Sequence, residues 1–151
     1  MKRYVYSLFV LCMAGFLSAC SEKSVVIDSP IVGEWHLETW MSETPEDFDV
    51  YISFRENGSF EMYQKVETPA FVRYEGSYSV SGSVVSGIYS DGMPWSTSYT
   101  FTLSDGNNSL TMVSDTPGAE TGVYSRTTIP EDVLNSIGLK SLSVEDVPRF
   151  L

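Results

Sequence analysis

The chain has 151 residues, a formal net charge of −11 and 42% hydrophobic residues, with two cysteines and one histidine. The acidic excess excludes nucleic acid as a partner, because neutralising phosphates requires clustered Lys and Arg. It also disfavours electrostatic attachment to an anionic lipid surface. The apolar content is sufficient for the core of one domain of ordinary size.

The first twenty residues have the pattern of a targeting segment. Lys2 and Arg3 precede an apolar run, and small residues then lead to Cys20 in the sequence Leu-Ser-Ala-Cys. The run is short for a membrane-spanning helix, which needs about 20 predominantly apolar residues. The pattern resembles the signal of bacterial lipoproteins, and a plain signal peptide or an uncleaved short anchor is the alternative. We expect a signal at residues 1–19, a covalent lipid on Cys20, a polar tether at residues 20–30 and an outer-membrane lipoprotein of the cell envelope.

From residue 31 onward the dominant hydrophobic period is two, which is typical of half-buried antiparallel strands. In the second strand, for example, Val50, Ile52 and Phe54 share one face. The pattern predicts eight strands, at residues 32–41, 49–56, 58–66, 71–80, 83–90, 97–104, 109–114 and 121–128. Short, evenly spaced strands of this kind indicate an all-β barrel or sandwich.

The connections alternate between short and long. Compact turns follow strands two, four and six, whereas longer connections, each with a proline, follow strands one, three, five and seven. In an up-and-down meander these two kinds of connection lie at opposite ends, which favours an eight-stranded antiparallel up-and-down barrel over a Greek-key sandwich. The long loops should bring the tentative ligand-binding residues to the open end: Phe48, Pro69, Met93, Pro94, Trp95 and Pro117.

The sequence around Trp95, Met-Pro-Trp, predicts either an exposed contact surface at a loop tip or an indole folded down as a lid on the barrel. The acidic residues of the long loops should give this rim a negative potential that disfavours fatty-acid carboxylates. They are Glu43, Glu46, Asp47, Asp49, Glu67, Asp91, Asp115 and Glu120.

Two short motifs mark the first and last strands. Gly33, Glu34 and Trp35 resemble the G-x-W of lipocalins, and Arg126, in Tyr-Ser-Arg, resembles the arginine that this family places over the tryptophan. The resemblance covers residues 31–128 and is strongest to small lipocalin-like lipoproteins of Bacteroides-type bacteria, although the T-D-Y motif of lipocalins is absent. It implies a lipocalin-like barrel with Gly33, Trp35 and Arg126 at its structural base. Trp35 as an ordinary core aromatic of another β-sandwich is the alternative, and Trp40 should face outward in either case.

After the last strand, residues 129–151 are predicted to form a short helix and a docked tail. Thr128 and Glu131 form a capping-box pattern, and Gly138 is suited to end the helix. Two sets of apolar residues should pack on the barrel: Val133, Leu134 and Ile137 from the helix, and Leu139, Leu142, Val147 and Phe150 from the tail.

The sequence contains no recognisable catalytic arrangement, cofactor motif or metal site. His36 alternates with Trp35, which places it on the outside of the barrel without a second histidine or a cysteine beside it. The acidic stretch at residues 43–49 lacks the spacing of a calcium loop. We therefore expect no enzymatic activity and no cofactor.

Two functions remain open at this stage. By resemblance to lipocalins, the first is a lipid-anchored binding module that holds a small apolar, neutral or cationic ligand at the open end. The second is an interaction or assembly protein with a filled barrel and no small-molecule ligand, because inward aromatic side chains can fill an eight-stranded interior completely.

Overall fold

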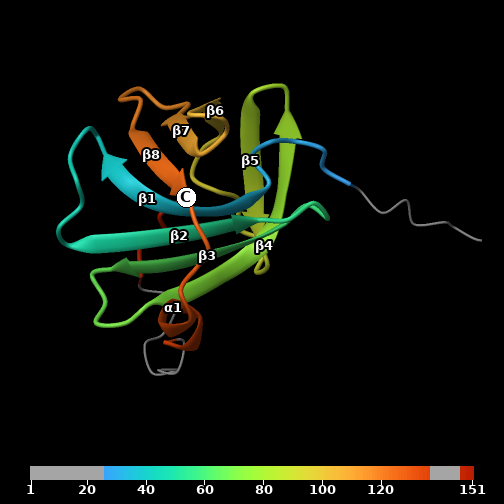
Figure 1. Ribbon diagram of the computed structural model, residues 1–151. Helices are drawn as coiled ribbons and strands as arrows, with labels where there is room; N and C mark the ends of the chain where they lie inside the picture. The colour runs from blue at the N-terminus through green and yellow to red at the C-terminus, as the bar shows by residue number, and fades with distance from the viewer. Residues whose placement is uncertain (1–25, 137–146) are drawn as a thin grey trace, which may run out of the picture.

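The computed structural model describes residues 26–136 and 147–151, which contain eight strands and one short helix (Figure 1). The strands are β1 (Gly33–Trp40), β2 (Phe48–Phe54), β3 (Ser59–Val66), β4 (Val72–Ser81), β5 (Val84–Tyr89), β6 (Tyr99–Ser104), β7 (Ser109–Ser114) and β8 (Thr121–Arg126). Each strand pairs with the next, and β8 pairs with β1 to close the barrel. The predicted all-β, eight-stranded antiparallel up-and-down barrel is confirmed, with every strand within two residues of its predicted bounds.

Several predicted features lie outside the described residues. They are the signal at residues 1–19, Cys20, the first part of the tether, Ile137, Gly138, Leu139 and Leu142. In the ranges that the structure describes, no helix is long and apolar enough to cross a membrane.

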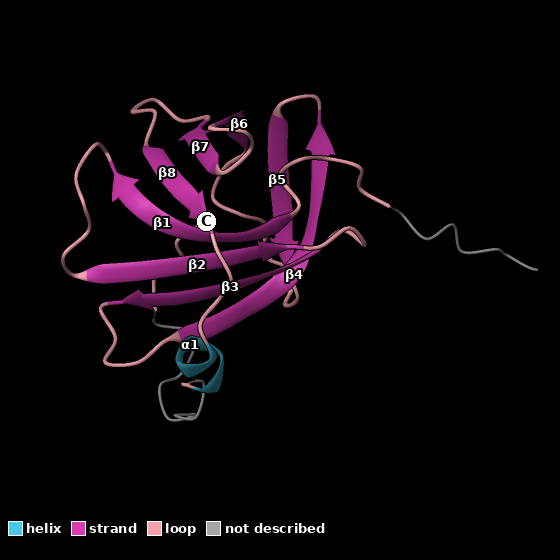
Figure 2. Cartoon of the chain, in the orientation of Figure 1, coloured by secondary structure: helices cyan, strands magenta, loops and turns pink. Residues whose placement is uncertain are grey.

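The two ends of the barrel differ in the connections that they carry (Figure 2). The turns at residues 55–58, 82–83 and 105–108 lie at one end, which we call the base. The connections at residues 41–47, 67–71, 90–98 and 115–120 start from the other end, which we call the mouth. This is the sorting of short and long connections expected of a meander.

The interior of the barrel is filled by aromatic and aliphatic side chains. Phe54 and Phe60 are fully buried, as their period-two positions predict. Their ring centroids lie 4.9 Å from Tyr78 and 5.1 Å from Trp95, respectively. Aromatic pairs at such distances contribute about 0.5–1.5 kcal/mol beyond the burial of their area. The packing therefore joins β2, β3 and β4 to the 90–98 connection across the inside of the barrel.

The base is organised around Trp35 and Arg126. The Arg126 guanidinium carbon lies 4.2 Å from the centroid of the Trp35 ring, and the indole Nε1 donates to the Ile31 carbonyl at 2.7 Å. Gly33 has a φ of +139°, and a Cβ there would lie 2.1 Å from the Arg126 Nη1. Glycine is required at this position both for its backbone conformation and for the space that the arginine occupies.

A β-bulge in β1 changes the predicted orientation of Trp40. The register of β1 against β8 shifts between Leu37 and Thr39, where one additional residue interrupts the alternation. Trp40 therefore turns toward the core and packs against it as a partly buried residue. The expectation that Trp40 faces outward is wrong, because it assumed a strict alternation of side chains that the bulge interrupts.

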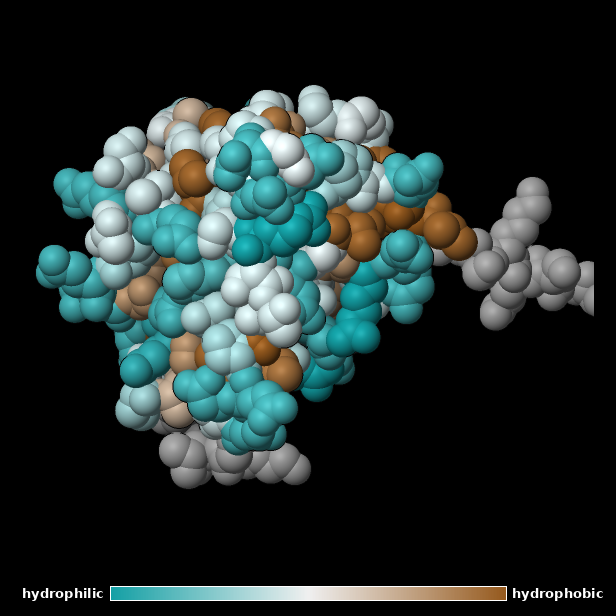
Figure 3. All heavy atoms as spheres, viewed as in Figure 1, coloured by the Kyte–Doolittle hydropathy of each residue, from teal (hydrophilic) through white to brown (hydrophobic). Residues whose placement is uncertain are grey.

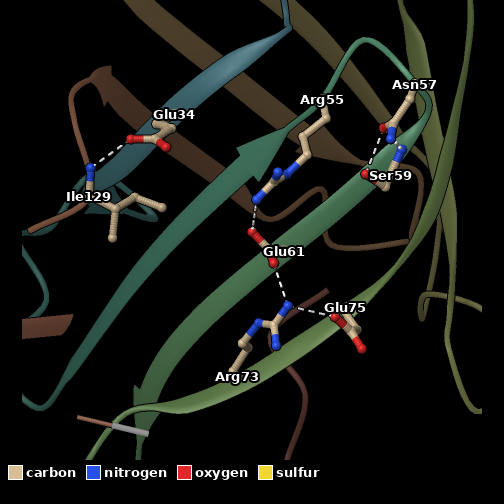
Figure 4. A network of polar contacts seen from close by, with 8 residues as sticks. All are labelled: Glu34, Arg55, Asn57, Ser59, Glu61, Arg73, Glu75 and Ile129. Carbon is tan, nitrogen blue, oxygen red and sulfur yellow. Dashed lines mark hydrogen bonds and ion pairs between the residues drawn. The ribbon is translucent and has the colours of Figure 1, made fainter. Parts of the chain in front are cut away.

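Helix α1 (Glu131–Asn135) packs on the outside of the barrel. Its N-cap is Pro130, without a side-chain cap, so the predicted capping box at Thr128 is wrong. Instead, the Glu34 carboxylate accepts a hydrogen bond from the Ile129 N–H at 2.7 Å, as Figure 4 shows. This bond fixes the chain ahead of the helix to β1.

Only part of the apolar helix face contacts the barrel. Val133 is buried in a cluster with Tyr63 and Ile129. Leu134 is 40% exposed, which contradicts its predicted packing. A helix of five residues makes little more than one turn, and one inward position therefore suffices to dock it.

An ion-pair network joins the turn after β2 to the outer faces of β3 and β4 (Figure 4). Glu61 accepts hydrogen bonds from both Arg55 and Arg73, and Arg73 also donates to Glu75 at 2.6 Å. Although burial acts to raise it, the pKa of the Glu61 carboxyl is lowered by its two arginine partners. The carboxylate therefore stays ionised between two cations, one in the turn after β2 and one in β4.

The described part of the N-terminal segment lies against the base. The Ile27 N–H donates to the Glu56 carbonyl at 2.6 Å, and the Ile27 side chain packs against the core. Figure 3 shows apolar atoms gathered where this segment meets the barrel. Val26 is 69% exposed there. The chain thus contacts the base before it reaches residue 31, the predicted start of the barrel.

Replacing Trp35 by alanine is expected to lower the free energy of unfolding by about 3–5 kcal/mol, the usual range for a large buried aromatic. Trp40→Ala is the matched control and should cost clearly less, because Trp40 is only partly buried. Urea unfolding of both variants measures the difference. Equal losses would contradict the role of Trp35 as the centre of the base.

Candidate functional site

The mouth of the barrel is occupied by residues 147–151, which we call the docked segment. Gln64 of β3 continues the inward series of Phe60 and Met62 and is 0% exposed. Its side-chain amide donates to the Pro148 carbonyl at 2.7 Å and accepts a bond from the Phe150 N–H at 2.9 Å. A buried amide is costly without partners. The docked segment supplies two of them.

The aromatic side chain of the docked segment lies between two aromatic residues of the mouth. The Phe150 ring centroid is 4.8 Å from that of Trp40 and 5.8 Å from that of Phe48. Leu151 is buried in the main core cluster, and its main-chain oxygen accepts a hydrogen bond from the Tyr89 hydroxyl at 2.8 Å. The segment therefore extends the core across the mouth.

Arg149 provides a cation on the other side of the docked segment. Its guanidinium carbon lies 4.5 Å from the Tyr89 ring centroid and 5.3 Å from that of Tyr74, within the usual range of a cation–π contact. Arg149 also pairs with the Asp91 carboxylate. These residues, with Arg73, Glu75 and Ser90, line a pocket of about 310 Å³.

The protonation states of Asp91, Tyr74 and Tyr89 favour a cation at the position of Arg149. Hydrogen bonds from Arg149 and from the Met93 main chain lower the pKa of the Asp91 carboxyl to about 2. Burial raises the pKa of the Tyr89 and Tyr74 hydroxyls. At neutral pH Arg149 consequently lies between the ionised Asp91 carboxylate and the two neutral phenol rings of Tyr74 and Tyr89.

The residues predicted to form the mouth have different positions. Phe48 contacts the docked segment through Phe150. Pro69, Pro94 and Pro117 are exposed, and Met93 is 60% exposed at the end of a turn. The structure therefore places one of the six predicted residues against the docked segment and four of them at the surface.

Trp95, the sixth, is not an exposed mouth residue: its side chain lies deep in the barrel and is 4% exposed. The chain turns at Tyr89–Met93 and returns along β5, with an Ile88–Pro94 bridge and a hydrogen bond from the Trp95 N–H to the Gly87 carbonyl at 2.9 Å. This strand-like stretch aims the indole inward over Gly87. Of the two alternatives that the sequence left open for Trp95, the structure has the indole folded into the barrel and not the exposed loop tip.

Sequence reasoning missed most of the residues that hold the docked segment. Trp40, Gln64, Tyr74 and Tyr89 were not predicted to line the mouth, and Asp91 was predicted only as part of the acidic rim. The sequence does contain one signal for a residue of the mouth: Gln64 is a polar residue at an inward position of a strand. For Trp40 the bulge concealed the orientation.

His36 lies outside this site, on the outer surface of β1. Its ring stacks on Tyr51 with centroids 4.4 Å apart and hydrogen-bonds to Asp49 at 2.8 Å and Glu38 at 3.2 Å. Within the described ranges, no group of three or more His, Cys, Asp or Glu side chains has an arrangement suited to a metal ion.

Comparison with known proteins identifies a family and several similar solved structures. The model of the family described as "Lipocalin-like domain" matches residues 31–112. A lipocalin-like protein from Bacteroides uniformis ATCC 8492 is 19% identical, with 66% of this chain and 100% of that chain covered and a TM-score of 0.47. An uncharacterized protein from Bacteroides eggerthii DSM 20697 is 14% identical, with 64% and 98% covered and a TM-score of 0.46. Among curated proteins, none matches the chain.

Gly87→Ala is expected to lower the free energy of unfolding by about 1–3 kcal/mol, the usual cost of overpacking a core. A Cβ at this position would lie 2.3 Å from the Cε2 of Trp95. In a Trp95→Leu background the cost should largely disappear, because the indole is gone. Urea unfolding of the four chains of this cycle tests the contact.

Gly118→Ala provides the control, since no described atom lies within 4 Å of a Cβ there. A cost for Gly87→Ala that is the same with and without the indole would contradict the inward position of Trp95.

Proposed function

The chain belongs to the lipocalin-like domain family, and from this premise we propose that it is a lipid-anchored binding module of the cell envelope. Its site is the mouth of the barrel, where it holds a small apolar ligand that is neutral or cationic. The fold is one that generally binds molecules rather than transforming them, and the proposal places the ligand where the docked segment now lies.

The observation that carries this proposal is the pairing of an aromatic cleft with a cation site in the mouth. Phe150 lies between Trp40 and Phe48, and Arg149 lies over the rings of Tyr74 and Tyr89. Flat apolar groups and delocalised cations are the chemistry that such surroundings favour. A ligand with these two features reproduces the contacts that the protein makes with its own chain.

The filled interior limits the length of the ligand. Trp95 packs against Phe54 and Phe60, so a long acyl chain cannot extend toward the base without displacing core side chains. The Asp91 carboxylate on the rim adds repulsion toward anionic head groups. Both features argue against fatty acids as ligands.

A lipid on Cys20 would attach the domain from the side of the base. From Cys20 to Ile27 the chain spans at most about 25 Å. Ile27 contacts the turn at residues 55–58 through the Glu56 carbonyl. The contact of Ile27 with this turn supports an anchor that reaches the domain from the base, and we propose that the mouth is directed away from the membrane surface.

The filled interior also favours a second candidate, a lipoprotein that acts in interaction or assembly without a small-molecule ligand. In that case the aromatic packing is purely structural, and the docked segment is a permanent part of the core. The two candidates differ in whether the mouth responds to added ligands.

Titration with organic aromatic cations or neutral aromatic compounds is expected to change the tryptophan emission of the protein, whereas fatty acids should have little effect. Trp40 is the expected reporter, since it is the tryptophan that contacts Phe150. Trp40→Phe should therefore lose the response, and Trp95→Phe should keep it. Tight binding of a fatty acid would refute the charge and length arguments, and a lack of response to every class would favour the assembly candidate.

Replacing Cys20 by alanine should move the protein from the membrane fraction to the soluble fraction without changing its fold. The reason is that Cys20 is the only residue to which the lipoprotein signal would attach lipid. Cys12→Ala is the matched control and should leave the protein membrane-bound. Fractionation after a salt wash measures the outcome, and retention of the Cys20→Ala variant on the membrane would contradict the anchor.

A further inference from the structure

The docked segment is held largely through its backbone, in the manner of a bound peptide. Gln64 contacts the main chain of Pro148 and Phe150, which are two residues apart, and Tyr89 contacts the main-chain oxygen of Leu151. None of these three bonds depends on the identity of a docked side chain. A site that pairs with main-chain groups in this way accepts an extended chain in general.

Side-chain contacts then select the sequence. Arg149 lies over Tyr74 and Tyr89 and pairs with Asp91, whereas the next residue, Phe150, lies between Trp40 and Phe48. The site thus offers a cation position and an aromatic position to two consecutive residues.

From this geometry we infer that the mouth is a peptide-binding site and that the docked segment is its intramolecular occupant. The ligand is an extended segment of another protein in which a cationic residue precedes an aromatic one. The inference goes beyond the proposed function: it rests on the same site, the mouth of the barrel, but names a protein segment in place of a small molecule as the ligand.

Because the protein's own docked segment occupies the site, a free peptide has to compete with it for binding. A segment tethered to its site has an effective concentration on the order of millimolar for short linkers, so a free peptide of similar intrinsic affinity binds weakly. Weakening the docked segment removes this competition and raises the apparent affinity for a peptide in trans, in proportion to the fraction of free site. The unpartnered hydroxyl of Tyr74, buried and without a hydrogen bond among the described residues, offers a donor to such a ligand.

The test uses the full chain and a fluorescent, C-terminally amidated peptide with the sequence of residues 147–151, Val-Pro-Arg-Phe-Leu. Binding is followed by fluorescence anisotropy to the unchanged protein and to the Arg149→Ala/Phe150→Ala variant, whose site residues are intact. The variant is expected to bind the peptide at least about tenfold more tightly. A peptide with alanine at the positions of Arg149 and Phe150 should bind at least about tenfold more weakly than the original to the same variant.

Adding Gln64→Ala to the double variant should weaken peptide binding about tenfold, because the two main-chain bonds are lost. Circular dichroism verifies that each variant is folded, and Arg149→Ala alone, a milder change, should give a smaller gain in the same direction. Equal binding by the unchanged protein and the double variant, or equal binding of the two peptides, would overturn the inference. If organic cations bind the double variant but the peptide does not, the peptide class is wrong and the proposed function stands. If neither binds, both are wrong.

Discussion

The closure of the barrel depends on the contacts of one guanidinium group. Arg126, in the last strand, donates to the main-chain carbonyls of Pro30, Val32 and Asn107, each at 2.9 Å, while it covers the Trp35 ring. The three acceptors belong to the segment before β1 and to the turn between β6 and β7. Closing a sheet removes its exposed edges. At the base, Arg126 thus joins the first strand, the last strand and the turn between β6 and β7.

The filled interior of the closed barrel limits the space that the mouth can offer to a ligand. An eight-stranded barrel is only wide enough for side chains or one small ligand, and in this chain Trp95 and its aromatic neighbours occupy the interior. At this end of the barrel, the space for a ligand therefore lies above them. The residues that line it belong to distant parts of the chain, from Trp40 in β1 to Asp91 after β5. The fold thus separates a rigid aromatic core from a mouth whose occupant is a short segment.

The strands could be predicted from sequence because their information is local. Alternation at Val50, Ile52 and Phe54 describes both the strand and its inward face. Features that depend on irregular backbone or on distant partners could not be predicted. The bulge that turns Trp40 inward leaves no trace in composition, and Trp95 enters the core only because Gly87 lies opposite it. The apolar tail residue Phe150 was expected to pack on the barrel, but its partners were not, because residues such as Gln64 and Pro148, 84 positions apart, are linked by no periodic pattern.

The proposed exchange of the occupant of the mouth is consistent with the chemistry of Gln64. An amide buried inside a barrel costs free energy when unpaired, so this residue is a poor choice for a permanently apolar core. With the segment docked, its oxygen and nitrogen are both satisfied. With the segment displaced, the same groups would face the open mouth and bind water. Each hydrogen bond contributes only about 0.5–1.5 kcal/mol net of water. The polar part of docking is thus nearly balanced, and the docked segment is held mainly by the burial of Leu151, the aromatic contacts of Phe150 and the cation contacts of Arg149.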